Sequence, residues 1–105
     1  MVRYEESIRQ AIWIVLATAR GERKMRPDFG CGLHDLIFAG NSAEASGRAV
    51  TEVRRSLILW EPRIEVLDVA AGADPGDPGC LLIAISYRVR ATNNRFNLVY
   101  PFYLE

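Results

Sequence analysis

The tetrapeptide Trp60-Glu61-Pro62-Arg63 separates two hydrophobic patterns in this chain of 105 residues. Apolar residues before it recur at the spacing of an α-helix, and those after it alternate as they do in β-strands. Pro62 has no amide hydrogen and its ring disfavours the α-helical region for Glu61, so a helix that arrives here must end. The bend fixes Glu61 and Arg63 beside the large aromatic side chain of Trp60. This corner is either only a junction in the fold or also a contact site for a partner.

The segment before this corner has the spacing of an amphipathic helix. Asn41 and Glu44 resemble a capping pair and predict where the helix begins. Its apolar stripe consists of Ala49, Val50, Val53, Leu57 and Trp60. Ile58 and Leu59 lie off that stripe, which predicts a contact surface wider than a chain of this length covers alone.

A second amphipathic helix is predicted nearer the amino end, from Glu5 to Thr18, with Gly21 as its C-terminal cap. Its apolar face consists of Tyr4, Ile8, Ala11, Ile12, Val15, Leu16 and Ala19. Trp13 lies off this face, so we expect it either under a loop of its own chain or against a partner subunit.

Residues 21–32 predict an ordered loop, because glycines and a proline punctuate a stretch that also contains bulky apolar side chains. Gly30 and Gly32 indicate close backbone approach, although no phosphate-binding motif follows them. The next residues, 33–38, predict a short helix that Gly40 closes.

Two arginines in this loop, Arg23 and Arg26, are suited to holding a partner's carboxylate. The alternative is a solvated charge cluster in which they pair with Glu22 and Asp28. The sequence leaves both interpretations open.

Few side chains of the chain suggest catalytic or metal chemistry. His34 precedes Asp35, but no nucleophile motif accompanies the pair, so we expect a structural or surface histidine. Cys31 and Cys80 are far apart and form no CxxC pair, which predicts two reduced and buried thiols. One histidine cannot complete a zinc site with them, so the sequence predicts neither a metal nor a cofactor.

After the corner the hydrophobic period changes to two. Ile64 and Val66 alternate, and then Leu67 and Val69 take the opposite phase, which predicts a bulge near Val66–Leu67. Residues 72–79 predict a long, exposed hairpin tip. The next run presents Leu81, Ile83, Ile85, Tyr87 and Val89 on one face. After a turn at residues 92–94, the last run presents Phe96, Leu98, Tyr100, Phe102 and Leu104.

These patterns predict a single α+β domain over residues 1–105. Two main helices and a short helix would pack on a three-stranded antiparallel β-meander whose C-terminal strand leaves an open edge. Pro101 inside that last strand is awkward for a central position and predicts an edge. An open edge is able to pair with a strand from a partner.

The charge balance of the chain limits its partners. Lys plus Arg and Asp plus Glu both total 13, so the formal net charge is zero. That balance argues against binding to nucleic acid or to an anionic membrane, and it suits a subunit of an assembly. No signal peptide pattern is visible, and the longest apolar run, residues 11–17, is too short to span a bilayer.

Three runs of the sequence are similar to one known family. They are residues 21–30, Trp60-Glu61-Pro62-Arg63-Ile64, and Thr92-Asn93 through Asn97-Leu98-Val99-Tyr100-Pro101-Phe102. In the same order and over nearly the whole chain, they resemble the small baseplate wedge family of contractile tails. That family includes the phage tail-sheath initiator and its counterparts in type VI secretion and extracellular contractile injection systems. The last run is nearest to an extracellular particle or phage-like tail, and the leading segment of some members is expected to be missing.

The resemblance implies a structural subunit without a cofactor. Its Glu61-Pro62-Arg63 corner, with Arg23 and Arg26, would bind the helical core of the larger wedge proteins. Its last strand would accept sheath strands by edge pairing and template the sheath, through Asn97, Leu98, Val99, Tyr100, Pro101 and Phe102. The implied partners are larger wedge proteins, sheath subunits and tube or hub proteins, in a six-fold assembly that is built in the cytoplasm.

Two other functions remain as alternatives. Members of this family have carried a lysozyme-like label, and a glycoside hydrolase needs two carboxylates that face each other across a cleft. The candidates Glu22, Asp28, Glu61 and Glu65 each have an arginine or lysine nearby in sequence, which predicts ion-paired carboxylates rather than a general acid. The other alternative is a small standalone adaptor outside any tail.

Overall fold

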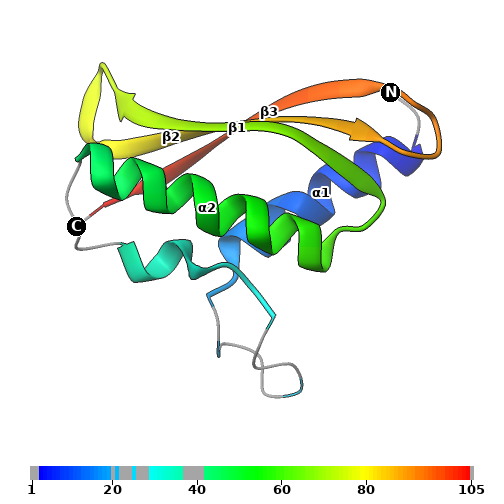
Figure 1. Ribbon diagram of the computed structural model, residues 1–105, viewed down its shortest axis with the longest axis horizontal. Coiled ribbons are helices and arrows are strands. Elements are labelled where there is room, and N and C mark those ends of the chain that lie inside the picture. Colours follow the sequence, from blue (N-terminus) through cyan, green and yellow to red (C-terminus); the bar gives the residue numbers. More distant parts are fainter. Residues whose placement is uncertain (1–2, 20, 22–24, 26–28, 37–41, 105) are drawn as a thin grey trace.

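The computed structural model describes residues 3–19, 21, 25, 29–36 and 42–104. The elements in chain order are α1 (Arg3–Ala17), the 3-10 helix η1 (Gly32–Leu36), α2 (Ala43–Trp60), β1 (Ile64–Asp74), β2 (Asp77–Val89) and β3 (Arg95–Tyr103). The strands form one antiparallel sheet in the order β1-β2-β3. The helices lie together on one side of this sheet (Figure 1), which confirms the predicted α+β meander with a free edge at β3.

The core lies between the helices and the inner face of the sheet. Ala49, Val53 and Leu57 of the predicted α2 stripe are fully buried, and Val50 and Trp60 pack at its margin. The strands supply the other half of the core with Leu81, Ile83, Ile85, Tyr87, Val89, Leu98, Tyr100 and Phe102, all of them buried. The two hydrophobic periods of the sequence therefore identify most of the core correctly.

The N-cap of α2 is one residue later than the predicted cap. Ser42 is the N-cap, with an extended backbone at φ −114° and ψ 165°, and its hydroxyl accepts a hydrogen bond of 3.1 Å from the amide of Ala45. Serine and asparagine cap helices equally well, so residue type alone could not choose between two neighbouring candidates. Asn41 itself lies outside the described residues.

Helix α1 ends at Ala17, so the prediction that Gly21 caps it was wrong, although Gly21 does have a positive φ of 84°. The chain leaves the helix at Thr18, whose carbonyl accepts a hydrogen bond of 2.9 Å from the amide of Cys31. Gly30 makes this approach possible, because a Cβ there would lie 2.5 Å from the Thr18 carbonyl oxygen. The predicted close backbone approach at Gly30 is thus confirmed, with a physical cause.

The predicted short helix is the 3-10 helix η1, and the remainder of the prediction, residues 37–40, lies outside the described part of the chain. His34 of η1 has a structural role. Its Nε2 lies 3.1 Å from the Leu16 carbonyl oxygen, and its ring meets Phe102 edge-on with centroids 5.6 Å apart. These contacts join η1 to α1 and to β3.

The predicted bulge in β1 is confirmed, because the pairing register with β2 shifts between Val66 and Asp68. The predicted hairpin tip lies where expected and most of residues 72–79 are exposed, but the predicted length of the tip was wrong. Strand β1 continues to Asp74 and β2 begins at Asp77, so only Pro75 and Gly76 form the turn. The pairing with β2 continues through residues of weak strand propensity as far as Ala73, and a second register shift between Ala73 and Asp74 precedes the turn.

Two buried phenols predict a dependence of stability on alkaline pH. Burial raises the pKa of Tyr87 and of Tyr100 above the ordinary value of 10.0. The unfolded chain therefore loses these protons at a lower pH than the folded chain. Their contribution to stability is complete below about pH 10 and is lost as the pH rises through the higher folded pKa values. We expect the urea midpoint to fall above about pH 10, and to fall less in Tyr100→Phe. An unchanged midpoint up to about pH 11 would contradict this.

Candidate functional site

The corner after α2 has the backbone geometry that Pro62 predicts. Glu61 ends the helix at φ −132° and ψ 74°, outside the α-helical region. Its amide still donates to the Leu57 carbonyl at 2.9 Å, so the last turn of the helix is complete. The amide of Ile64 then donates to the Glu61 carbonyl at 3.4 Å, which closes the turn into β1.

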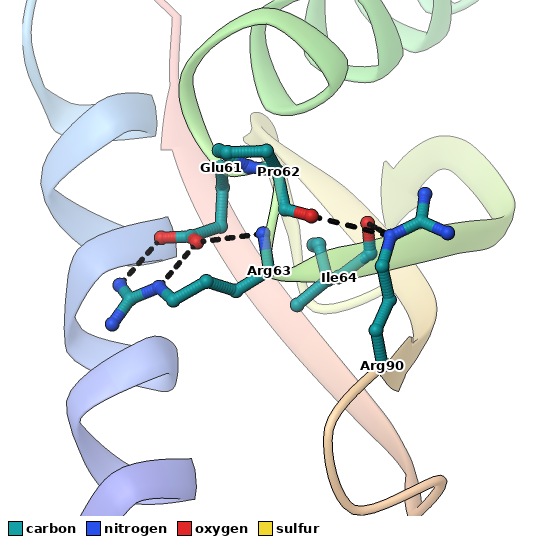
Figure 2. Close-up of polar contacts among 5 residues, drawn as sticks. All are labelled: Glu61, Pro62, Arg63, Ile64 and Arg90. Carbon is teal, nitrogen blue, oxygen red and sulfur yellow. Dashed lines mark hydrogen bonds and ion pairs between the residues drawn. The ribbon is translucent and has the colours of Figure 1, made fainter.

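The side chains of Glu61 and Arg63 bind each other at this corner (Figure 2). The guanidinium of Arg63 donates to the carboxylate through Nε at 2.7 Å and through Nη2 at 2.8 Å. The backbone amide of Arg63 donates to the same carboxylate at 3.3 Å. The Glu61 side chain is only 4% exposed and that of Arg63 is 38% exposed. Glu61 is therefore directed inward, and the hydrogen bond to it raises the pKa of Arg63, which remains charged.

Arg90, which follows β2, holds the corner from the opposite side (Figure 2). Its Nε donates to the carbonyl oxygens of Pro62 and Ile64, at 3.2 Å each. Its backbone amide donates to the Arg63 carbonyl at 3.0 Å. The ring of Tyr4 in α1 lies 6.0 Å from the Arg63 guanidinium carbon, within the range of a cation–π contact. Two segments far from the corner in sequence, α1 and the residue after β2, thus contact Arg63 or the backbone around it.

A second polar contact connects α1 to the turn between β2 and β3. Glu5 is buried, and one of its carboxylate oxygens accepts hydrogen bonds from the Thr92 hydroxyl at 2.7 Å and from the Asn94 side-chain amide at 2.8 Å. Asn93 between them has a φ of 62°, which asparagine tolerates better than most residues. Sequence reasoning missed this contact, because an acidic residue in a first helical turn is commonplace.

Replacing Glu5 by alanine removes both charge-assisted hydrogen bonds at once. We expect Glu5→Ala to lower the free energy of unfolding by about 2 kcal/mol in urea titrations. Glu6→Ala, one residue further along the same helix, is the matched control and should change stability by no more than about 0.5 kcal/mol. Equal losses in the two variants would show that helix charge, and not the contact with the turn, causes the effect.

The backbone of β3 divides into an inward and an outward set of hydrogen-bonding groups. Val89 donates to the Asn94 carbonyl at 2.8 Å, and Leu104 donates to the Gly79 carbonyl at 2.7 Å. Both pairs keep the same register as the β2–β3 pairs between them. Hydrogen-bonded pairs alternate in an antiparallel ladder, so every second residue from 94 to 104 bonds to β2. Residues 95, 97, 99, 101 and 103 direct their backbone groups to the free edge.

This alternation separates the six predicted edge residues into two groups. Leu98, Tyr100 and Phe102 bond to β2, and their side chains are buried in the core. Asn97, Val99 and Pro101 direct their backbone outward, and Val99 is 53% exposed. Position 101 directs its backbone away from β2, so the missing amide hydrogen of Pro101 costs no hydrogen bond to β2. A proline therefore fits inside this strand.

The other predicted contact residues have different positions. Arg23 and Arg26 lie outside the described residues. Phe29, at the end of their loop, meets Trp60 edge-on with centroids 5.1 Å apart, next to the corner. Trp13 packs edge-on against Tyr100 at 4.7 Å and is still 41% exposed.

The described residues contain neither a candidate metal-binding group nor a disulfide bond. Among these residues no group of three or more His, Cys, Asp or Glu side chains is placed to hold a metal ion. Cys31 and Cys80 are both buried and form no disulfide, as predicted. Within the same residues, every helix is too short or too polar to cross a lipid bilayer.

The sequence of this chain is similar to those of known proteins. The family described as "Baseplate wedge protein gp25" matches residues 2–94. The baseplate wedge protein gp25 of Enterobacteria phage T4 is 29% identical over 63 residues, which are 60% of this chain and 48% of the phage protein. The match thus spans about half the length of that curated relative.

Solved structures share the fold. A Geobacter sulfurreducens protein, provisionally named a tail lysozyme, is 56% identical with a TM-score of 0.91, over 100% of this chain and 95% of that one. A chain of the anti-feeding prophage baseplate is 28% identical with a TM-score of 0.74, over 80% and 67% of the two chains. A chain of the type VI secretion baseplate complex has the same fold at 17% identity, with a TM-score of 0.77 over 98% and 95%. Since the family match covers most of its length, this chain belongs to the baseplate wedge protein gp25 family.

Proposed function

We propose that this chain binds larger wedge subunits through its proline corner and templates the first sheath ring through the free edge of β3. Membership of the family makes the chain a structural component of a contractile-tail baseplate. The proposal that β3 templates the sheath rests on the row of outward-directed backbone groups along this strand. A strand with such a row is a site for addition of a further strand.

The two edges of the sheet differ in their fitness for strand addition. The bulge between Val66 and Asp68 interrupts β1, and bulges protect edges from pairing. Strand β3 pairs with β2 without a register shift from Arg95 to Tyr103. Its outward amides at Asn97 and Val99 are separated by the spacing that an incoming antiparallel or parallel strand requires. Pro101 then limits the addition, because it has a carbonyl group to offer but no amide.

At the corner, Arg63 is the residue that we assign to the partner contact. Glu61 uses only some of the five N–H donors of the guanidinium, and the side chain remains 38% exposed. The other groups of Arg63 are able to bind a carboxylate or a backbone carbonyl on a helical wedge subunit. Glu61 is then a positioning residue, and Arg90 fixes the backbone around both.

The hydrolase alternative receives little support from the described carboxylates. Glu61 is bound by Arg63, and the carboxylate of Glu65 accepts a hydrogen bond of 3.0 Å from Nε of Arg88, whose Nη2 lies 2.9 Å away in the same ion pair. A general acid must donate a proton to the glycosidic oxygen, and a carboxylate that accepts hydrogen bonds from an arginine is poorly placed for that role. We expect the purified chain to release no sugar from peptidoglycan. Robust turnover that Glu22→Gln or Glu61→Gln abolishes would overturn this view.

The structural role is tested in cells that assemble the native particle. We expect deletion of this chain to leave neither complete baseplates nor sheathed tails in electron micrographs, and the wild-type chain supplied in trans to restore both. Full-length sheathed particles in the deletion strain would contradict the proposal. A standalone adaptor would instead leave particle assembly unchanged and would not sediment with the particle.

A further inference from the structure

We propose that the outward side of α2 is a third docking surface, which binds an acidic amphipathic helix of another subunit. It lies on neither the corner nor the β3 edge. Val50, Thr51, Arg54, Arg55 and Ile58 line a groove of about 340 Å³ along this side of the helix. The proposed occupant follows from the shape, the apolar content and the charge of the groove.

The shape of the groove is that of a helix-packing site. Residues 50, 54 and 58 form one row along α2, and residues 51, 55 and 59 form the next row. The space between two such rows, each with a spacing of four residues, accepts the corresponding row of a second helix at about −50°. An extended strand lacks a ridge of this pitch, so the geometry favours a helical occupant.

Two exposed aliphatic side chains lie at the carboxyl-terminal end of the groove: Ile58 lines it, and Leu59 follows Ile58 in sequence. Ile58 is 64% exposed and Leu59 is 62% exposed, whereas the opposite side of α2 is packed in the core. Two neighbouring large aliphatic side chains at this exposure are costly for an isolated surface. An occupant with apolar residues at every fourth position would remove both from water.

The charged residues of the groove indicate which side chains should flank the apolar row of the bound helix. Arg54 and Arg55 line it, and within the described residues neither forms an ion pair. The acidic residues of α2, Glu44 and Glu52, line an adjoining depression together with Arg48, and the two depressions meet at Thr51. Two unpaired arginines beside an apolar row match a helix that has glutamates beside its apolar row. With a net charge of zero, the chain has no comparable attraction for a polyanion.

The test uses two fluorescent helical peptides and the purified full chain. Both peptides have leucines at positions i, i+4 and i+8, and the flanking positions are glutamate in one peptide and lysine in the other. We expect anisotropy titrations to show about tenfold tighter binding of the glutamate peptide. In Arg54→Glu/Arg55→Glu this preference should reverse, and Ile58→Ser should weaken binding of both peptides about fivefold.

The matched control is Arg3→Glu/Arg95→Glu, which makes the same change of net charge at two other exposed positions. It should leave the preference for the glutamate peptide unchanged. An equal loss in the control and in Arg54→Glu/Arg55→Glu would reduce the effect to diffuse attraction and overturn the proposal. Sedimentation velocity provides a second arm, because a dimer that Ile58→Ser dissociates would assign the groove to a second copy of this chain. Neither result depends on whether the corner or the β3 edge has its proposed partner.

Discussion

Replacing Arg63 by alanine is expected to lower the free energy of unfolding by about 3 kcal/mol, measured in urea at neutral pH. Glu61 is the physical reason. Its side chain is 4% exposed and depends on the Nε and Nη2 groups of Arg63 for two short hydrogen bonds. Alanine at position 63 leaves a buried carboxylate with only a backbone amide at 3.3 Å. A stranded buried charge costs far more than the loss of an exposed ion pair.

The double variant Glu61→Gln/Arg63→Ala separates this cost from the partner contact. Without a buried charge to strand, it should lose only about 1–2 kcal/mol. Arg63→Lys keeps the charge but not the planar fork, so its stability should lie between those of the wild type and Arg63→Ala. If Arg63→Ala is no less stable than the double variant, Glu61 is hydrated and the contact has little value.

The same variants distinguish a fold junction from a contact site. Glu61→Gln/Arg63→Ala folds without a stranded charge and lacks the guanidinium. We therefore expect it to be absent from purified baseplates, although it is folded by circular dichroism. Normal incorporation of this variant would restrict the corner to a role in folding. Arg63→Ala alone could not decide the question, because its instability would reduce incorporation for a second reason.

Replacing Val99 by proline is expected to yield particles with baseplates but without sheath. The amide of Val99 is directed to the free edge of β3, so a proline there removes an outward donor and leaves the pairing with β2 intact. Together with Pro101, it would deprive the edge of two of its outward amides. We expect the fraction of sheathed particles in electron micrographs to fall at least about tenfold, since each lost backbone bond at a buried interface leaves a carbonyl unpaired.

Two control variants make this experiment specific. Val99→Ala removes the side chain and keeps the amide, so it should retain the sheath. Pro101→Val adds a donor to the same edge and is expected to increase self-association of the purified chain, because a complete edge pairs less selectively. If Val99→Pro assembles a full-length sheath, β3 is not the template. If Val99→Ala also loses the sheath, side-chain packing on the outer face of the sheet is responsible.

Local patterns in the sequence were sufficient for the elements and most of the core. Periods of 3.6 and of two residues arise from backbone geometry within each segment, so they can be read without knowledge of neighbours. The end of α2 at Glu61, the bulge after Val66 and the edge position of Pro101 are of the same kind. Two of them follow from the limits that proline sets on the backbone, and the bulge follows from a change of phase in the alternating apolar residues.

The tertiary structure alone decided what each of these features contacts. The sequence placed Glu61 and Arg63 together, but the burial of the carboxylate comes from the folded chain, in which the pair lies beside α1 (Figure 2). Arg90 reaches the corner and Glu5 reaches Asn94 across long stretches of chain. Pairing register determines which amides of β3 are directed outward. Burial, register and long-range contacts depend on how separate elements come together, and this information is absent from the periodicity of any single segment.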